Sequence, residues 1–546
     1  MAAGAGRRLL PMGERAVLVE VPTLSDVIAL HSALEATAPA GLIDLVPAAR
    51  TVLVHVDPAV LPLAAAREWI AGVTGRAFDA SPAAGEVILD IRYDGADLAE
   101  TAALLAIGVD ELVRRHSGAV WTVAFTGFAP GFGYLVSEDW AFDVPRLDAP
   151  RTRVPAGAVG LAAGFTGAYP RETPGGWRLI GRTDTSLFDP DATDPAVLAP
   201  GTRVRFRPRS ASASATASAT ASATDTNSGQ EAAPEATRRP IRPPTLVQPE
   251  FVHGESERGR GLEIIDAGLL ATVQDLGRPG RAALGVARSG AMDRGALRTG
   301  NRLVGNPEGR AGIEITMGGF RARAGERLWF AVTGAWGPVR LDGRTVDPYL
   351  AHEWPAGSEL HIDWATHGAR MMLALRGGVD VDEVLGSRST DVLAGLGPDR
   401  LVAGAWVPVG EDPAAPIPAA PPAAWGAPAD DLEILLAPGA RAEWFTDAAV
   451  AALFEAEWTV GDEADRVGMR LDGPALPRRI DGELASEGMV VGAMQVPPSG
   501  RPTVLCADGP VTGGYPVIAV VADASLDALA QARPGARVRF RHAKPA

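Results

Sequence analysis

Cysteine and lysine are nearly absent from this chain of 546 residues. Cys506 is the only cysteine, so disulfide bonds within the chain and cysteine-rich zinc sites are excluded. It lies in the apolar stretch 503–507, where we expect a buried small hydrophobic residue rather than a nucleophile. Lys544 is the only lysine, and every other basic residue is an arginine. A lysine-dependent phosphate loop, a Schiff-base lysine and an internal biotinyl-lysine carrier are therefore excluded.

Long apolar runs and basic runs are also missing. No uninterrupted apolar stretch reaches the roughly 18 residues of a membrane helix, and residues 1–11 lack the apolar core of a secretion signal. The formal net charge of −15 and the scattered arginines disfavour a nucleic-acid partner and an anionic membrane surface. The 8 histidines show no ligand-like spacing, so we predict no structural metal. We therefore expect a cytoplasmic protein without nucleic-acid or membrane contacts.

Composition and low-complexity segments divide the chain into several domains. Hydrophobic residues make up 47% of the sequence, which is enough for a separate core in each domain. Residues 210–224 alternate alanine with serine or threonine, and a Pro-rich charged stretch follows. Because such a segment cannot offset the entropy of ordering it, 209–260 is predicted to be a disordered linker between two halves. A Pro/Ala-rich segment at 413–430 is expected to connect two parts of the second half.

The first half begins with an α+β pattern and then becomes β-rich. Residues 1–92 show strand patterns near 15–21, 42–46, 51–56 and 87–91, with helices beginning at Thr23 and covering about 61–73. This βαββαβ order predicts a ferredoxin-like domain. After short helices, residues 119–208 consist of apolar runs broken by glycine and proline, and 262–540 continue in the same way. Such runs are typical of closed or sandwiched β-domains.

The two halves end on nearly the same sequence. Residues 200–207 read PGTRVRFR and residues 534–541 read PGARVRFR, with seven of eight positions identical. Upstream of these ends lie the related motifs TGAYP at 166–170 and TGGYP at 512–516, each preceded by a Val-Pro pair. Signals repeated in the same order predict two copies of one β-domain, at 93–208 and 431–546. A further β-rich domain is expected at 261–412.

The first half carries glycine, arginine and histidine residues that suit ligand binding. Glycines among aromatic residues at 126–135, including Gly131, allow a close approach to a ligand, although a packed β-corner would use them equally well. His116 ends a helix, where it would serve as a proton shuttle or as a cap. Guanidinium groups on Gly/Pro loops suit a nucleotide phosphate, or else are solvated surface groups; these loops contain Arg146, Arg151, Arg153, Arg171, Arg178, Arg182, Gly175 and Gly176.

The second half concentrates amide, carboxylate and guanidinium groups in glycine-rich turns. Such polar groups are more numerous than the turns themselves require, although Asx-turns and internal salt bridges would also explain each one singly. The residues are Gln274, Asp275, Arg278, Asp293, Arg388, Asp391, Arg466 and Gln495.

Together these motifs resemble two of the proteins that make up bacterial 5-oxoprolinase. Segments 127–135, 150–157, 166–170 and 174–183 resemble its B-type component, and segments 272–278, 289–293, 303–306, 386–391, 465–471 and 492–498 resemble its C-type component. The same modules are similar to the carboxyltransferase lobe of urea carboxylase and to a regulator pair of a sporulation histidine kinase. The resemblance implies a mixed α+β and mainly β protein, in which cyclophilin-like β-barrel domains follow the ferredoxin-like domain. Family members usually place a glutamine before each Thr-Gly-x-Tyr-Pro motif, whereas this chain has Phe165 and Pro510.

The function implied by the resemblance is ATP-dependent opening of a lactam, 5-oxoproline, to glutamate. ATP and Mg²⁺ would be the cofactors, and a separate A-type 5-oxoprolinase component would be the partner. The resemblance leaves open biotin-dependent carboxyl transfer, regulation of a histidine kinase, and pairing of the halves between two chains as a homo-oligomer. Because cations offset the charge of a transferring phosphoryl group, the expected catalytic residues are His116, Arg153, Arg182, Asp275, Arg278, Asp293, Arg388, Asp391 and Arg466. The residues expected to contact the nucleotide are Gly131, Arg146, Arg151, Gly175, Gly176, Gln274 and Gln495.

Overall fold

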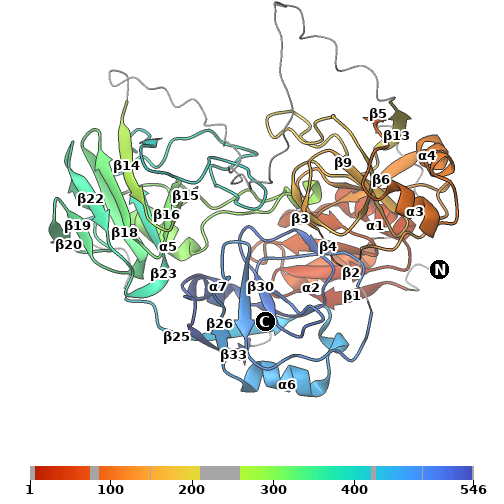
Figure 1. The fold of residues 1–546 in the computed structure, drawn as a ribbon. Helices are drawn as coiled ribbons and strands as arrows, with labels where there is room; N and C mark the ends of the chain where they lie inside the picture. Colours follow the sequence, from red (N-terminus) through yellow and green to blue (C-terminus); the bar gives the residue numbers. More distant parts are fainter. Residues whose placement is uncertain are drawn as a thin grey trace, which may run out of the picture.

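The computed structural model describes residues 6–73, 85–147, 149, 151–209, 259–419, 426–482 and 484–543. Residues 210–258 of the predicted linker, residues 420–425 of the Pro/Ala-rich segment and Lys544 lie outside this description. The fold is β-rich, with two mixed α/β units at the N-terminal end, a β-sandwich and a closed barrel (Figure 1). No helix in the described part of the chain is long and apolar enough to cross a membrane.

The first unit is an antiparallel sheet in the order β1-β2-β4-β3, covered on one face by two helices. Its strands are β1 (Arg8–Pro11), β2 (Ala16–Glu20), β3 (Leu42–Pro47) and β4 (Thr51–Val56), and its helices are α1 (Leu24–Ala36) and α2 (Leu63–Gly72). Helix α1 begins after Thr23, as predicted. The Thr23 hydroxyl accepts the Asp26 N–H at 3.1 Å while the Asp26 carboxylate accepts the Thr23 N–H at 3.1 Å, which satisfies two helix-end donors.

One predicted strand of this unit belongs elsewhere. The strand at 87–91 forms as β5 (Glu86–Ile91), but it pairs in parallel with β13 (Arg203–Pro208) in the next sheet. The fourth place in the first sheet is taken by β1, which forms a hairpin with β2 and was not predicted. Alternation of apolar residues indicates a strand without specifying its partner. The ferredoxin-like prediction is therefore not confirmed.

The second unit is a seven-stranded sheet in the order β12-β9-β10-β7-β6-β13-β5. Helices α3 and α4 pack beside it, and its core contains the buried Trp121 and Phe206. A separate two-stranded pair, β8 with β11, carries part of the predicted arginine-rich run. The elements not yet given are α3 (Leu98–Leu104), α4 (Val109–Gly118), β6 (Trp121–Thr126), β7 (Gly133–Val136), β8 (Arg151–Val154), β9 (Ala158–Ala162), β10 (Phe165–Ala168), β11 (Thr173–Gly175) and β12 (Arg178–Arg182).

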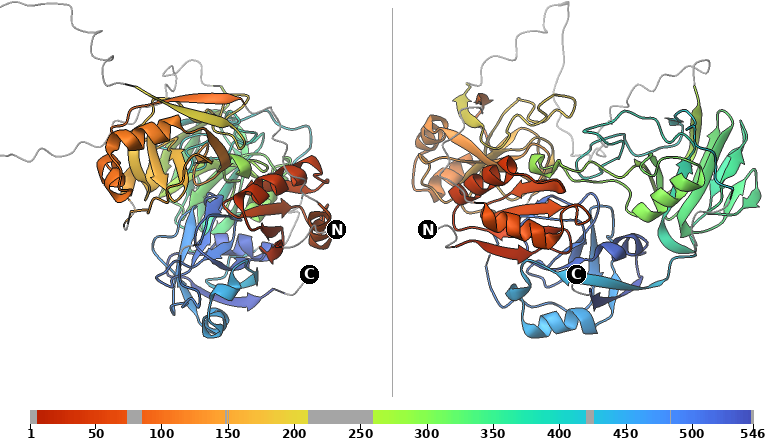
Figure 2. Two further views of the ribbon diagram at one scale, coloured as in Figure 1. Left: turned by 90° about the vertical axis from the view of Figure 1, so that its right-hand side faces the viewer. Right: turned by 180° about the vertical axis from the view of Figure 1, so that it is seen from behind.

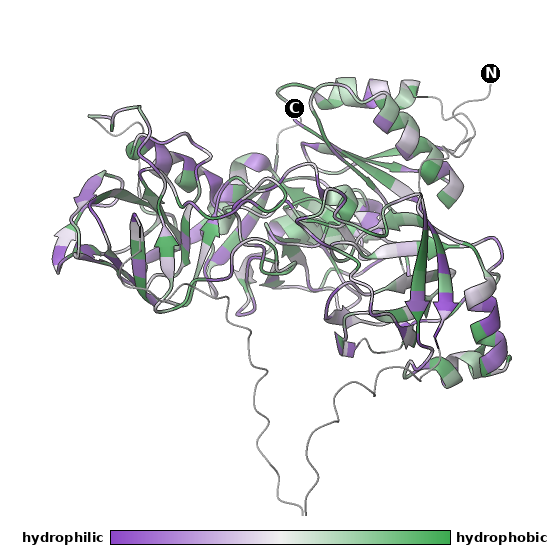
Figure 3. Ribbon diagram, turned by 90° about the horizontal axis from the view of Figure 1, so that it is seen from above, coloured by the Kyte–Doolittle hydropathy of each residue, from purple (hydrophilic) through white to green (hydrophobic). Residues whose placement is uncertain are grey.

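The third unit is a sandwich of a six-stranded and a five-stranded sheet, ordered β20-β19-β22-β17-β14-β24 and β15-β16-β23-β18-β21. Apolar residues from both sheets form one core between them, and Figure 3 shows hydrophobic and hydrophilic residues alternating along these strands. The elements are β14 (Gly261–Ala267), β15 (Leu270–Gln274), η1 (Ala282–Leu284), α5 (Arg294–Leu303), β16 (Gly312–Thr316), β17 (Phe320–Ala324), β18 (Leu328–Trp336), β19 (Val339–Leu341), β20 (Arg344–Val346), β21 (His352–Trp354), β22 (Glu359–Ile362), β23 (His367–Leu375) and β24 (Trp406–Pro408).

The fourth unit is a closed barrel in the order β25-β32-β29-β30-β27-β26-β33. Its interior is apolar and includes the buried Trp458 and Phe540. The elements are β25 (Asp431–Pro438), η2 (Ala442–Trp444), α6 (Asp447–Glu455), β26 (Trp458–Val460), β27 (Gly468–Asp472), β28 (Glu487–Gly488), β29 (Ala493–Gln495), β30 (Thr503–Leu505), β31 (Thr512–Gly513), β32 (Val517–Val521), α7 (Asp523–Ala530) and β33 (Arg537–His542).

The second unit and the barrel share one strand arrangement. In each, the final strand with the Arg-Val-Arg-Phe-Arg sequence pairs in parallel with the first strand, β13 with β5 and β33 with β25. The barrel closes because β25 also pairs with β32. At the equivalent edge of the second unit, only an isolated bridge joins Arg92 and Arg182. The repeated motifs thus mark two related sheets, one closed and one nearly closed.

The two halves of the chain pack directly against each other. The face of the β1–β4 sheet that is free of helices lies on the final barrel (Figure 2). Leu18 and Leu53 of the sheet share an apolar cluster with Met489 and Val520 of the barrel. Beside this cluster, buried Arg441 of the barrel pairs with Glu20 at 2.8 Å. In this structure the halves therefore pair within one chain.

Candidate functional site

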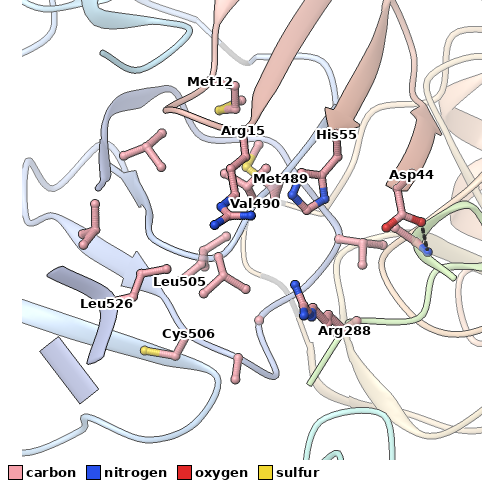
Figure 4. A pocket seen from close by; sticks show the side chains of 18 of the residues that line it. Met12, Arg15, Asp44, His55, Arg288, Met489, Val490, Leu505, Cys506 and Leu526 are labelled. Atoms are coloured by element: carbon pink, nitrogen blue, oxygen red, sulfur yellow. Dashed lines mark hydrogen bonds between the residues drawn. The ribbon is translucent and has the colours of Figure 1, made fainter. Parts of the chain in front are cut away.

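A cleft lies where the β1–β4 sheet, residues 278–294 and the final barrel meet (Figure 4). A neighbouring hollow shares Arg15, Arg288 and Arg294 with it. We call the combined space the arginine cleft. Its polar lining includes Glu14, Arg15, Asp44, His55, Arg278, Arg288, Arg294, Arg298, Asp523 and Asp527.

Both halves of the chain supply the lining, and strand periodicity decides which first-half residues take part. Val52, Val54 and Val56 of β4 pack against the helices, so Leu53 and His55 face the barrel. Asp44 of β3 lies on the same face. Its carboxylate accepts the N–H groups of Gly280 at 3.2 Å and Ala282 at 3.1 Å, which fixes the second-half segment across the cleft.

In the described part of the chain, some of the guanidinium groups in the arginine cleft have no carboxylate as an ion-pair partner. Arg15 pairs with Asp523, but within the described residues neither Arg288 nor Arg294 forms an ion pair. Burial and repulsion from Arg15 lower the pKa of Arg288, and burial and repulsion from Arg288 lower the pKa of Arg294 to about 10. Like charges held this close are stabilised by an anion between them. The cleft is therefore suited to a phosphate or carboxylate group.

The cleft also contains a histidine and the single cysteine. Burial, reinforced by Arg288, Arg15 and Arg294, lowers the pKa of His55 to about 4, so its imidazole is neutral at pH 7. Burial raises the pKa of the Cys506 thiol to about 12, and the side chain is only 4% exposed. Cys506 is thus a buried apolar wall residue, in agreement with the sequence prediction.

Arg466, one of the predicted second-half residues, lies in a buried network beside the cleft. Arg466 is 1% exposed and holds Asp508 with two hydrogen bonds of 2.9 Å, Glu314 at 2.5 Å and the Gly290 carbonyl at 2.7 Å. These contacts join the barrel to the sandwich. Arg466 therefore has no guanidinium nitrogen directed at a ligand, and its geometry is that of a structural ion pair.

The predicted carboxylates Asp275 and Asp293 are fully engaged within the protein. The Asp275 carboxylate accepts the hydroxyls of Ser387 at 2.6 Å and Ser389 at 2.5 Å, and two backbone N–H groups at 2.7 Å. Asp293 caps helix α5 at the Ala296 N–H and accepts the Gln531 amide at 2.6 Å. Burial and the neighbouring Asp527 raise the pKa of Asp293 to about 7. Across the described ranges, no group of three or more His, Cys, Asp or Glu residues could hold a metal ion.

Arg388 lies away from the cleft, on the outer side of the Asp275 turn. Its guanidinium pairs with Glu383 at 2.5 Å and with Asp380 at 3.3 Å. Both partners are more than half exposed, so this group belongs to the surface. Arg388 is therefore not brought to a shared anion site.

Gln274, Arg278 and Asp391 do come together, and Arg171 of the first half joins them. Arg278 lines the cleft and donates to the carbonyls of Ser389 and Val384. Within the described residues, one nitrogen each of Arg278 and Arg171 and one oxygen each of Asp391 and Gln274 have no hydrogen-bond partner. Burial and the nearby Asp508 raise the pKa of Asp391 to about 6.

Four of the predicted first-half arginines, Arg146, Arg151, Arg153 and Arg182, are not among the residues that line the cleft. Three of them pair with a nearby carboxylate, Arg151 with Asp97 at 2.6 Å, Arg153 with Glu172 at 2.5 Å and Arg182 with Asp94 at 2.8 Å. Arg146 is exposed. Acidic residues within the second unit thus pair with three of these four groups, and the convergence of all four on one anion stays a prediction.

The predicted glycines pack against protein rather than line a phosphate loop. The Gly131 N–H donates to the Leu284 carbonyl of η1 at 3.0 Å, so the 126–135 segment holds the second half. Gly175 lies against the Tyr169 ring, and the Gly176 carbonyl accepts the Leu147 N–H at 2.9 Å. In this structure the glycine-rich segments thus make contacts within the protein, and their role in nucleotide binding stays a prediction.

His116 and Gln495 are also structural. His116 is fully buried, with its ring nitrogens 2.8 Å from the Tyr93 hydroxyl and 2.9 Å from the Thr166 hydroxyl. Burial lowers its pKa to about 3, and the rings of Trp121, Trp140 and Phe206 surround the imidazole, so the structure does not place His116 in the arginine cleft. The Gln495 amide donates to the Tyr515 carbonyl at 3.3 Å in the barrel.

Sequence reasoning missed most of the cleft. Arg288 and Arg294 directly flank the 289–293 motif, so that motif was a signal for both of them. Arg15, Asp44 and His55 lie in apolar strand patterns about 230 residues or more before it and carry no local signal. Pro510, a departure from the family pattern, lines the cleft wall.

Comparison with known proteins assigns both halves to one family. Residues 284–542 match the family described as carboxyltransferase domain, subdomain A and B, and residues 7–198 match carboxyltransferase domain, subdomain C and D. The chain belongs to the carboxyltransferase-domain family. This confirms the family resemblance predicted from the motifs.

Relatives of both halves are known in the family. The chain is 38% identical over 284 residues to the C-type 5-oxoprolinase component of Escherichia coli strain K12, covering 51% of this chain and 90% of that protein. It is 48% identical over 115 residues to the B-type 5-oxoprolinase component of Escherichia coli O157:H7, covering 21% of this chain and 53% of that protein. The crystal structure of TTHA0988 aligns with a TM-score of 0.79 and 33% identity, covering 96% of this chain and 99% of that chain.

Proposed function

We propose that this chain joins the B-type and C-type components of an ATP-dependent 5-oxoprolinase in one polypeptide. A separate A-type component would complete the enzyme and open 5-oxo-L-proline to L-glutamate. The B-type and C-type relatives, which between them match parts of both halves, support this proposal. The observation that carries it is the arginine cleft, because residues of both halves are needed to form it.

The chemistry of the reaction accounts for the cleft. A five-membered lactam is a poor electrophile, and phosphorylation of its amide oxygen converts that oxygen into a leaving group. ATP supplies the phosphoryl group, whose negative charge fits the unpaired guanidinium groups of Arg288 and Arg294. Mg²⁺ commonly reaches such sites on the nucleotide with only one or two protein carboxylates, and Asp523 and Asp527 line the same hollow as these arginines.

The proposal is tested by reconstitution of the full chain with an A-type component. ATP-dependent release of glutamate from 5-oxoproline is expected only when both proteins are present. Arg288→Ala should reduce the rate about 10²-fold or more because it removes a cation from a preorganised site. Arg153→Ala, which removes an exposed pair, is the matched control and should keep the wild-type rate.

Two outcomes would contradict this assignment. Absence of glutamate release by the reconstituted wild-type proteins would remove the 5-oxoprolinase proposal. A wild-type rate in Arg288→Ala would separate the arginine cleft from the reaction.

Carboxyl transfer is the second candidate because the family model itself is described as a carboxyltransferase domain. This function would require a biotinylated carrier on another chain, since the sequence, in which Lys544 is the only lysine, excludes an internal carrier. Activity that depends on a biotinylated partner and is blocked by avidin would favour it over 5-oxoprolinase activity.

A further inference from the structure

His55 occupies a position in the arginine cleft that no pairing within the protein accounts for. It faces the barrel from β4, opposite Ala16 in the β2–β4 register and next to the strand that begins after Arg15. Within the described residues its imidazole forms no hydrogen bond. Figure 4 shows Arg15 and His55 directed into the same space from neighbouring N-terminal strands, with Arg288 across from them.

The carboxylates near His55 already have partners, whereas two of the nearby guanidinium groups form no ion pair across the described ranges. The facing carboxylates are already engaged: Asp44 accepts two backbone N–H groups, Asp523 pairs with Arg15, and Glu14 accepts the Asp523 N–H at 2.9 Å. Asp44, Asp523 and Asp527 interact electrostatically with Arg288 and Arg294, but within the described residues neither arginine forms an ion pair. A proton on His55 is therefore opposed mainly by guanidinium groups that an anion would neutralise.

This arrangement couples the occupancy of the cleft to the protonation of His55. With the cleft open, the arginines and burial keep the imidazole neutral. When an anion lies among the same arginines, the positive field at the imidazole falls and a proton becomes easier to hold. The two equilibria share the same groups, so each must shift the other by the same factor.

We propose that an anionic group in the arginine cleft raises the proton affinity of His55, and that its neutral imidazole is then the proton acceptor for the lactam substrate. The second clause rests on the proposed function. In that step the lactam N–H bond breaks and its proton passes to an imidazole nitrogen. The amide oxygen then forms a bond to the γ-phosphorus as the bond from that phosphorus to ADP breaks, so ADP leaves with its electron pair. An approaching phosphate would strengthen His55 as a base when the base is needed.

Proton uptake is measurable without turnover. The probe is sulfate, a divalent anion that does not titrate near neutral pH, bound to the full chain at pH 6.5. Calorimetry in two buffers of different ionisation enthalpy gives the number of protons taken up. Wild type should take up a measurable fraction of a proton. His55→Gln and His55→Asn should bind sulfate within a few-fold of wild type with uptake near zero, and Arg288→Gln should weaken sulfate binding at least about tenfold.

The opposing outcomes are distinct. The coupling would be overturned if folded His55→Gln took up as many protons as wild type. It would also be overturned if wild type bound sulfate without proton uptake, or did not bind sulfate. Catalysis is tested in the reconstituted enzyme, where His55→Gln should lower kcat about 10²-fold or more. A wild-type kcat would remove the catalytic role of His55, whereas the absence of activity in wild type would instead remove the proposed function.

Discussion

The buried Arg466 gives the sharpest test of a structural against a catalytic role. Arg466→Met would leave Asp508 and Glu314 inside the protein, where they are 0% and 2% exposed. Their remaining partners are the Ser289 hydroxyl at 2.6 Å and the backbone N–H groups of Val392 and Met292. Removing one partner of a buried ion pair costs about 3 to 5 kcal/mol because the other charges stay uncompensated.

Thermal unfolding measures this cost. A loss of that size should lower the midpoint of the transition of the second half by roughly 10 °C. The deficit should shrink as the pH falls, since protonation removes the unpaired negative charge. Arg205→Met is the matched control, because its ion pair with Glu86 is nearly half exposed and should leave the midpoint almost unchanged. A normal midpoint in Arg466→Met together with lost ATP turnover would refute this reasoning and restore the catalytic role predicted from the sequence.

Two further substitutions test the structure. Gly157→Ala should destabilise the second unit by more than about 1 kcal/mol in urea unfolding, because φ is +77° and a Cβ would lie 2.2 Å from the Thr183 carbonyl oxygen; unchanged stability would contradict this turn. The raised folded-state pKa of Asp293, about 7 against 3.8, means that its contribution to stability is present below pH 4 and is lost as the pH rises toward 7. Asp293→Asn should therefore flatten the stability profile between pH 4 and 7, and an unaltered slope would argue against a buried, proton-holding Asp293.

Sequence and structure agree best where local rules operate. The sequence alone indicated three such features: the start of helix α1 at Thr23 and Asp26, the apolar alternation of β4, and the repeated Arg-Val-Arg-Phe-Arg strands. The residues of the candidate site could be predicted from the sequence only in part. Polar residues in glycine-rich turns suggest a binding site, yet the hydrogen bonds of Asp275 and Arg466 join turns and structural units to each other. The imidazole of His116 is enclosed by aromatic rings.

The sequence by itself determined the exclusions, the two-part organisation and the family. A single cysteine, a single lysine and linked motifs in a fixed order are properties of composition and order, so folding cannot alter them. Only the tertiary structure decided which arginines share a cleft. Whether a guanidinium is paired depends on the carboxylates that packing brings within hydrogen-bonding distance. In the part of the chain that the structure describes, Arg153 and Arg182 each have such a carboxylate, whereas Arg288 and Arg294 form no ion pair.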